Sequence, residues 1–173
     1  LTNDFGGALI SREGAIPTRG LSKLAAPFVE AVDDGPLQRF FYNPQSTRPD
    51  AFRRLMLYGT ADMAGGVSEQ LAVLMKTGAF QSADGAIDFR AAMAGITTPV
   101  LVVAARLDRI AMAPAVKDGF RALGGPKEWL LITRANGTRG EYGHMDLVIG
   151  ERAAGEVWSK VLDFFDRHAR KEP

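Results

Sequence analysis

The run P-V-L-V-V-A at residues 99–104, followed by A-R-L-D at residues 105–108, decides the predicted fold of this chain. A continuous apolar run of this length is typical of a parallel strand whose two faces are both covered by helices. In open sheets of that kind, the ligand crevice lies beyond the carboxyl ends of the strands. We therefore expect Asp108 to lie on the rim where such a sheet binds its ligand.

A helix and a second strand are predicted after this first strand. Pro114 suits the first position of a helix, and Gly124-Gly125-Pro126 stops that helix and offers a glycine for a left-handed cap. Residues 128–133 form the second strand, which completes a β-α-β unit with a right-handed crossover. The apolar face of the helix comprises Val116, Phe120 and Leu123.

His144 follows the second strand as Asp108 follows the first, after a predicted loop over residues 134–143. Neighbouring strands lie about 4.8 Å apart, so short loops can bring the two side chains into hydrogen-bond contact. A carboxylate bonded to one ring nitrogen fixes the tautomer of a histidine and leaves the other nitrogen as a base. We therefore expect Asp108 and His144 to be catalytic, although such a pair activates a nucleophile without supplying one.

The rest of the sequence predicts helices around this unit. A last helix over residues 153–170 carries an apolar stripe and should pack flat on the sheet. Before residue 96, glycine pairs at Gly6-Gly7 and Gly65-Gly66 and five prolines divide the chain into short helices, with no alternating strand. We interpret residues 1–95 as a connection and a helical cap or lid. Residues 96–173 then form the part of an α/β fold that carries the acid and the histidine.

Composition excludes several classes of function. The chain is 46% hydrophobic and 24% charged, as is typical of a globular domain, and its net charge of +1 gives no footprint for nucleic acid or an anionic membrane. No apolar run approaches the roughly 20 residues of a membrane span, and the first residues lack the pattern of a signal peptide. The absence of cysteine excludes disulfides and thiolate catalysis within this chain, and it leaves the compartment open.

Residues 96–170 resemble the C-terminal third of the α/β-hydrolase superfamily. The resemblance rests on I-T-T-P-V-L-V-V-A-A-R-L-D at residues 96–108, the helix and strand that follow, and G-H-M-D-L at residues 143–147. In that family the chain order is nucleophile, acid, base, with the nucleophile on a G-x-S-x-G turn. The resemblance implies that Asp108 is the triad acid and His144 the triad base. The run after Gly143 is similar to the histidine segment of acid lipases and polyhydroxyalkanoate synthases.

The nucleophile of that family is missing from this sequence. Ser22 and Ser68 have the nearest contexts, but neither has the second glycine and neither follows an apolar strand. We therefore expect an N-terminal half of the same hydrolase, present as a separate segment or second chain, to carry the nucleophile, and we expect this chain alone not to be a stable monomer. The predicted activity is hydrolysis of a small-molecule carboxylic ester by a Ser-His-Asp mechanism without a cofactor. An epoxide hydrolase or dehalogenase with an aspartate nucleophile, and a non-catalytic binding module, are the alternatives.

Several further residues have a predicted place near the site. By position, the side chains nearest to substrate are those of Leu107, Ile110, Tyr142 and Met145. Four methionines of the cap region either line an apolar acyl pocket or fill the core: Met56, Met63, Met75 and Met93. Asp146 stands two residues after His144, but H-x-D without further ligands falls short of a metal site, so no metal is predicted. His168 and the arginines beside Asp108, Arg106 and Arg109, are expected to be surface charges.

Overall fold

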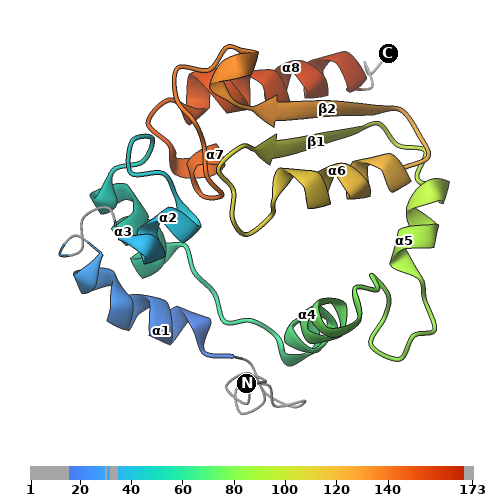
Figure 1. Cartoon of the computed structure of the whole chain (residues 1–173), viewed down its shortest axis with the longest axis horizontal. Coiled ribbons are helices and arrows are strands. Elements are labelled where there is room, and N and C mark those ends of the chain that lie inside the picture. The colour runs from blue at the N-terminus through green and yellow to red at the C-terminus, as the bar shows by residue number, and fades with distance from the viewer. Residues whose placement is uncertain (1–15, 30, 32–34, 170–173) are drawn as a thin grey trace.

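Two parallel strands form the centre of the C-terminal part of the protein. The computed structural model describes residues 16–29, 31 and 35–169. Strand β1 (Val100–Ala105) pairs with β2 (Lys127–Ile132) in a register from Val100↔Lys127 to Ala105↔Ile132, and helix α6 (Ala113–Ala122) connects them (Figure 1). The predicted β-α-β unit is confirmed, with each element displaced by one residue. The protein thus has a mixed α/β architecture.

One face of the sheet is covered by the C-terminal helix. Predicted as one helix over 153–170, this segment is a π-helical turn (Ala154–Trp158) that continues into α8 (Ser159–His168). The wider π turn brings Val157 onto the sheet, where it joins a buried cluster with Ala105, Ile132, Tyr142 and Ala153. This cluster lies directly below the ends of both strands.

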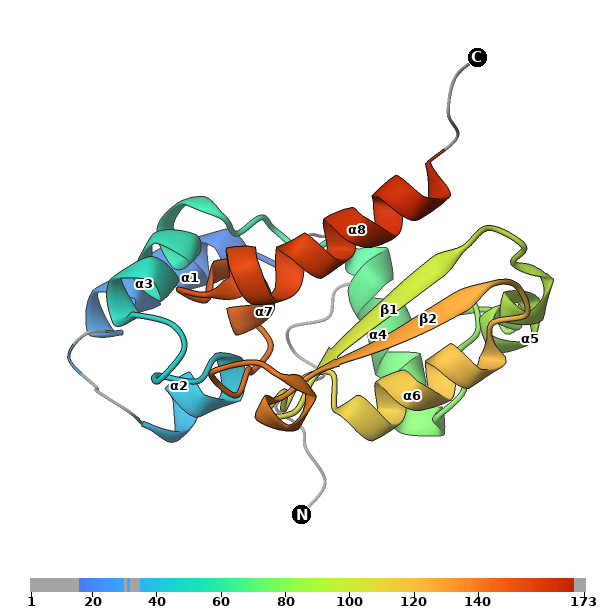
Figure 2. The same ribbon diagram turned by 90° about the horizontal axis from the view of Figure 1, so that it is seen from above.

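Helix α6 covers the opposite face, and Figure 2 shows it across the sheet from α8. The Phe120 ring lies 5.6 Å from the Trp129 ring, centroid to centroid, and the Lys117 ammonium lies over both rings. The glycines after α6 correct one prediction. Positive φ angles occur among the described glycines only at Gly78, Gly85 and Gly137, so Gly124 forms no left-handed cap.

Close backbone packing explains Gly124 instead. A Cβ atom at this position would lie 1.8 Å from the carbonyl oxygen of Ala94, and the Gly124 N–H donates to the Met93 carbonyl. The turn after α6 therefore lies against the short helices that precede β1, which are α5 (Phe89–Ala92) and a 3₁₀ turn (Met93–Gly95). Only a residue without a side chain fits there.

Four longer helices precede β1 in the described part of the chain. They are α1 (Thr18–Ala25), which continues into a 3₁₀ turn (Ala26–Phe28), α2 (Pro36–Phe41), α3 (Pro49–Tyr58) and α4 (Gly65–Thr77). Prolines begin α2 and α3, which is the position where a missing N–H is harmless. Within residues 16–29, 31 and 35–98, β structure is limited to two isolated bridges, Ile16↔Met63 and Gln81↔Asp88. Gly6-Gly7 lies outside the described residues.

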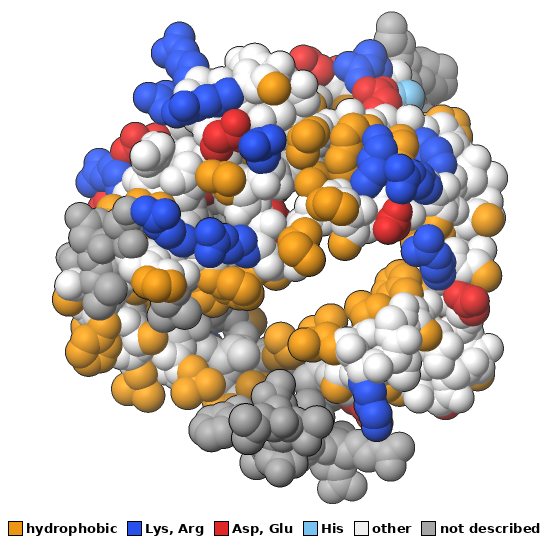
Figure 3. All heavy atoms as spheres, in the orientation of Figure 1, with side chains coloured by type: hydrophobic (Ala, Val, Ile, Leu, Met, Phe, Trp, Pro, Cys, Tyr) orange, Lys and Arg blue, Asp and Glu red, His pale blue; other side chains and the backbone are white. Residues whose placement is uncertain are grey.

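These helices differ in how they reach the sheet layer. Val29, Tyr42 and Phe52 form a second buried cluster, against which Met145 and Ile149 pack, so α2 and α3 contact the segment after His144. Helix α4 buries only Ser68 of its 13 residues, and Met75 is 87% exposed. Figure 3 shows a hollow between α4 and the sheet layer, with hydrophobic side chains on its rim.

Candidate active site

The Asp108 carboxylate contacts the His144 ring, as predicted. Oδ2 of Asp108 lies 2.8 Å from Nδ1 of His144, and the two residues come from the loops that follow β1 and β2. The pairing of those strands brings the two loops together, and the Leu107 N–H donates to the Tyr142 carbonyl at 2.9 Å between them. An acid and an imidazole 36 residues apart in sequence thus form one pair.

The loop after β1 fixes the acid rigidly. Oδ1 of Asp108 accepts the backbone N–H groups of Ile110 and Ala111 at 2.8 and 2.7 Å, so the carboxylate caps its own turn. Its side chain is 3% exposed, whereas that of His144 is 36% exposed. The acid is therefore enclosed and oriented, while the ring that it holds reaches the surface.

The contact also defines which nitrogen of His144 can act as a base. A carboxylate only accepts hydrogen bonds, so Nδ1 of the ring is the donor. In the neutral ring the lone pair then lies on Nε2, which points away from Asp108. A proton taken up at Nε2 gives an imidazolium that the neighbouring carboxylate stabilises.

Asp146 anchors the turn that carries His144, a role that the sequence did not reveal. Its fully buried carboxylate accepts the Gly143 N–H at 2.5 Å and the Asn43 N–H at 2.8 Å through Oδ2, and the Thr47 hydroxyl at 2.5 Å through Oδ1. Burial raises the pKa of this carboxyl above its usual range, and the three hydrogen bonds oppose that rise. The H-x-D spacing was the only signal available in the sequence.

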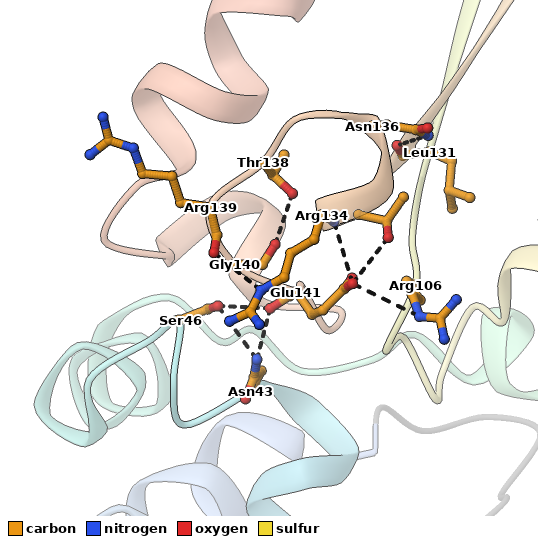
Figure 4. Close-up of polar contacts among 11 residues, drawn as sticks. Asn43, Ser46, Arg106, Leu131, Arg134, Asn136, Thr138, Arg139, Gly140 and Glu141 are labelled. Carbon is orange, nitrogen blue, oxygen red and sulfur yellow. Dashed lines mark hydrogen bonds and ion pairs between the residues drawn. The ribbon is translucent and has the colours of Figure 1, made fainter.

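A second polar network holds the loop before His144 against the helical part (Figure 4). The main-chain carbonyl of Glu141 accepts the side chains of Asn43 and Ser46 at 2.8 and 2.7 Å. The Glu141 carboxylate accepts the Thr133 hydroxyl, at the end of β2, and the Arg134 N–H. The loop from β2 to His144 is thus fixed at both of its ends.

An apolar cavity of about 250 Å³ lies beside the turn of His144. Met145 lines it from the histidine side and Met56 from α3. Its remaining lining comes from the 3₁₀ turn after α1 and from α1, α2 and α3, including Phe28, Phe41, Phe52 and Leu55. Such a space suits an uncharged hydrocarbon group.

A second cavity, of about 430 Å³, is polar. Leu107 and Arg109 line it from the loop after β1, and Arg134 and Glu141 from the loop after β2. Arg109, expected as a plain surface charge, therefore faces this cavity. The other two residues expected to be surface charges form ion pairs. Arg106 lies 3.9 Å from the Glu141 carboxylate. His168 is exposed and lies 3.3 Å from the Glu128 carboxylate.

The four side chains predicted near substrate divide into three groups. Met145 lines the apolar cavity, and Leu107 and Ile110 are each 43% exposed beside Asp108. The prediction that Tyr142 lies near substrate is wrong, because its side chain lies in the core cluster at the strand ends and is 1% exposed. Its hydroxyl donates to Glu156 at 2.8 Å, and burial, followed by the Glu156 contact, raises the pKa of the phenol. Tyr142 therefore anchors the loop before His144 to the core.

Neither serine considered in the sequence stands at a turn after a strand. Ser22 lies within α1, and Ser68 lies in the first turn of α4 and donates to the Gly65 carbonyl. In the described part of the chain, no group of three or more His, Asp or Glu side chains is placed to hold a metal ion. Nor does any helix there combine the length and the apolar character that crossing a bilayer requires.

Comparison with known proteins found no relatives. No protein-family model, no curated protein and no solved structure matches this chain.

Proposed function

We propose that this chain is the acid- and base-bearing part of a serine hydrolase of the α/β-hydrolase type that acts on carboxylic esters. The contact between Asp108 and His144 is the observation that supports this proposal most strongly. A buried carboxylate, held by two backbone N–H groups and aligned on the inner nitrogen of a partly exposed histidine, is the arrangement that general-base activation of a hydroxyl requires.

The proposed reaction proceeds through an acyl-enzyme. Nε2 of His144 takes the proton of a serine hydroxyl as its oxygen attacks the ester carbonyl, and Asp108 stabilises the imidazolium. The imidazolium then gives that proton to the departing alkoxide, so the alcohol leaves and the acyl group stays on the serine. A water molecule, deprotonated by the same nitrogen, attacks the acyl-serine; the bond between the acyl group and the serine oxygen breaks, the imidazolium returns its proton to that oxygen, and the acid leaves.

The apolar cavity supports an ester with a hydrocarbon acyl group as the substrate. Met145 lines this cavity and is the next residue after His144. An acyl chain seated between Met145 and Met56 would lie next to the turn that carries His144. The α1–α3 helices that enclose the cavity would then act as the cap of the site.

The nucleophile is proposed to come from a segment or chain outside these 173 residues. Among the described residues β1 pairs with β2 alone, which leaves one edge of β1 without a neighbouring strand. Val67, Leu71 and Met75 of α4 are exposed, and hydrophobic side chains rim the hollow between α4 and the sheet layer (Figure 3). Exposed apolar surface and an open strand edge both favour association with a further part of the hydrolase.

Two other functions compete with this proposal. An aspartate nucleophile, as in epoxide hydrolases and dehalogenases, would use the same acid and base, and it would not react with a fluorophosphonate. A non-catalytic binding module would keep the cavity and would show no turnover. Our proposal rests on the contact between Nδ1 of His144 and the buried Asp108 carboxylate, which a binding module does not need.

Hydrolysis of p-nitrophenyl esters tests the proposal, measured on the assembled protein, that is, this chain together with the part that carries the nucleophile. We expect turnover of acyl esters, and we expect His144→Ala to lower kcat by at least about 10³-fold, because the base is removed. His168→Ala is the matched control, since His168 is exposed and lies at the far end of α8. The absence of ester turnover, or equal activity of His144→Ala and His168→Ala, would reject the proposal.

A further inference from the structure

We infer that Asp146 is a positioning residue, which holds the His144 turn against the helical part of the protein through the three hydrogen bonds that its carboxylate accepts. Two of the donors, the Asn43 N–H and the Thr47 hydroxyl, come from the segment between α2 and α3, and the third is the Gly143 N–H. The kinetic consequences of this inference rest on the proposed function. Its structural consequence, the orientation of the His144 ring, does not.

The arrangement requires a buried acceptor at this place. The Gly143 N–H directly precedes His144, so fixing it restricts the backbone from which the ring projects. A Cβ atom on Gly143 would lie 3.1 Å from Oδ2 of Asp146 and 3.3 Å from the backbone of Tyr42, so the turn lies against both neighbours. Without the carboxylate, two backbone N–H groups would lose their partner inside the protein.

Other contacts of the same segment reinforce this connection. The Met145 N–H donates to the Phe41 carbonyl at 2.9 Å, and the Glu151 N–H donates to the Ser46 carbonyl at 2.9 Å. Residues 41–47 therefore contact the chain on both sides of Asp146. The Asp146 carboxylate accepts donors both from residues 41–47 and from Gly143, so it links the segment between α2 and α3 directly to the turn of His144.

Asparagine at position 146 provides the sharpest variant. Its carbonyl oxygen can accept both backbone N–H groups, and its amide can donate to the Thr47 hydroxyl, which also accepts hydrogen bonds. Asp146→Asn should therefore preserve the position of the turn without the negative charge. Asp146→Ala removes all three acceptor contacts. Phe164→Ala, in α8, is the control for general destabilisation, because Phe164 is buried far along the chain from His144.

The experiment combines kinetics with the NMR signal of the His144 Nδ1 proton in the assembled protein. In the wild type we expect a downfield signal from the Nδ1–H bonded to Asp108. In Asp146→Ala this signal should shift or broaden, and kcat should fall by about 10²-fold with little change in KM, because the ring is displaced. Asp146→Asn and Phe164→Ala should retain the signal and most of the kcat.

The inference is overturned if Asp146→Ala keeps the signal and kcat of Phe164→Ala. It is also overturned if Asp146→Asn is as impaired as Asp146→Ala, since asparagine supplies the same acceptors. Should Asp146→Ala fail to fold, Thr47→Val decides the matter, because it removes one donor and an unchanged Nδ1 signal would contradict the inference. A wild type without hydrolase activity, whose Nδ1 signal still depends on Asp146, would reject the proposed function and leave this inference standing.

Discussion

The sheet layer and the helix α4 both carry apolar side chains, but they place them in opposite surroundings. In the sheet layer, Ala105, Ile132 and Val157 are almost completely buried and lie beneath the loops of Asp108 and His144. In α4, Val67, Leu71 and Met75 are exposed, and the helix stands apart from the sheet (Figure 1). The part that positions the acid and base is thus packed by this chain itself.

The helices α1, α2 and α3 lie between these two extremes. They bury Val29, Tyr42 and Phe52 and enclose the apolar cavity, and they are joined to the His144 turn through Asp146 and Glu141. These helices therefore pack against the segment that carries His144, which α4 does not. In α4, by contrast, the apolar side chains of Val67, Leu71 and Met75 stay exposed.

The largest effect is expected from the acid itself. Asp108→Asn keeps the size of the side chain and places an amide where the carboxylate accepts Nδ1–H, so the ring adopts the wrong tautomer. We expect kcat for ester hydrolysis to fall by about 10⁴-fold. Asp118→Asn, on the exposed surface of α6, is the control and should leave kcat unchanged. Steady-state kinetics would contradict the acid's role if the two variants were equally active.

Substitutions of two glycines test the contrast between the packed sheet layer and the exposed helix α4. Gly124→Ala places a Cβ atom 1.8 Å from the Ala94 carbonyl oxygen, and it should destabilise the protein by about 2–4 kcal/mol. Gly66→Ala, in α4, meets no atom within 4 Å and should stabilise the helix by about 0.5–1 kcal/mol. Urea denaturation measures both. Similar effects of the two substitutions would break the contrast between the regions.

Two methionines test the apolar cavity. Met56→Trp fills part of the space between α3 and Met145, so kcat/KM for a long acyl ester should fall by about 10- to 100-fold relative to an acetate ester. Met75→Trp on the exposed face of α4 should leave this ratio unchanged. A ratio that moves equally in both variants would exclude the cavity as the acyl site.

The last effect concerns Tyr142 and depends on pH. Tyr142→Phe removes the hydrogen bond to Glu156 and should cost about 1–2 kcal/mol of unfolding free energy at pH 8. Burial raises the pKa of Tyr142 in the folded protein, so at alkaline pH the phenol ionises first in the unfolded chain. This ionisation stabilises the unfolded state and lowers the free energy of unfolding of the wild type, but not that of Tyr142→Phe. The difference between wild type and Tyr142→Phe should therefore shrink above about pH 10. A constant difference from pH 8 to pH 11 would contradict this.

The sequence was sufficient to predict the sheet unit and the acid–base contact. Both follow from short-range patterns, because a continuous apolar run defines each strand and parallel pairing places the two following loops side by side. The one-residue displacements of the strands do not alter which loops meet. For the same reason Asp108 could be paired with His144 across 36 residues without any coordinates.

Features set by tertiary contacts were out of reach of sequence patterns. Asp146 accepts donors from Asn43 and Thr47, about 100 positions earlier, and nothing in the spacing of those residues indicates the contact. The pair Gly124-Gly125 after a helix predicts a left-handed cap, whereas the neighbouring Ala94 backbone is what requires a glycine at position 124. Tyr142 was placed near substrate by its position in the loop, and its side chain turns inward instead.

Fluorophosphonate labelling of the assembled protein, followed by peptide mass spectrometry, tests the central claim most directly. Our account predicts one adduct, on a serine outside these 173 residues within a G-x-S-x-G turn, and its loss in His144→Ala but not in His168→Ala. Absence of an adduct in the wild type, or an adduct that forms equally well in His144→Ala, would contradict the claim that Asp108 and His144 activate a serine.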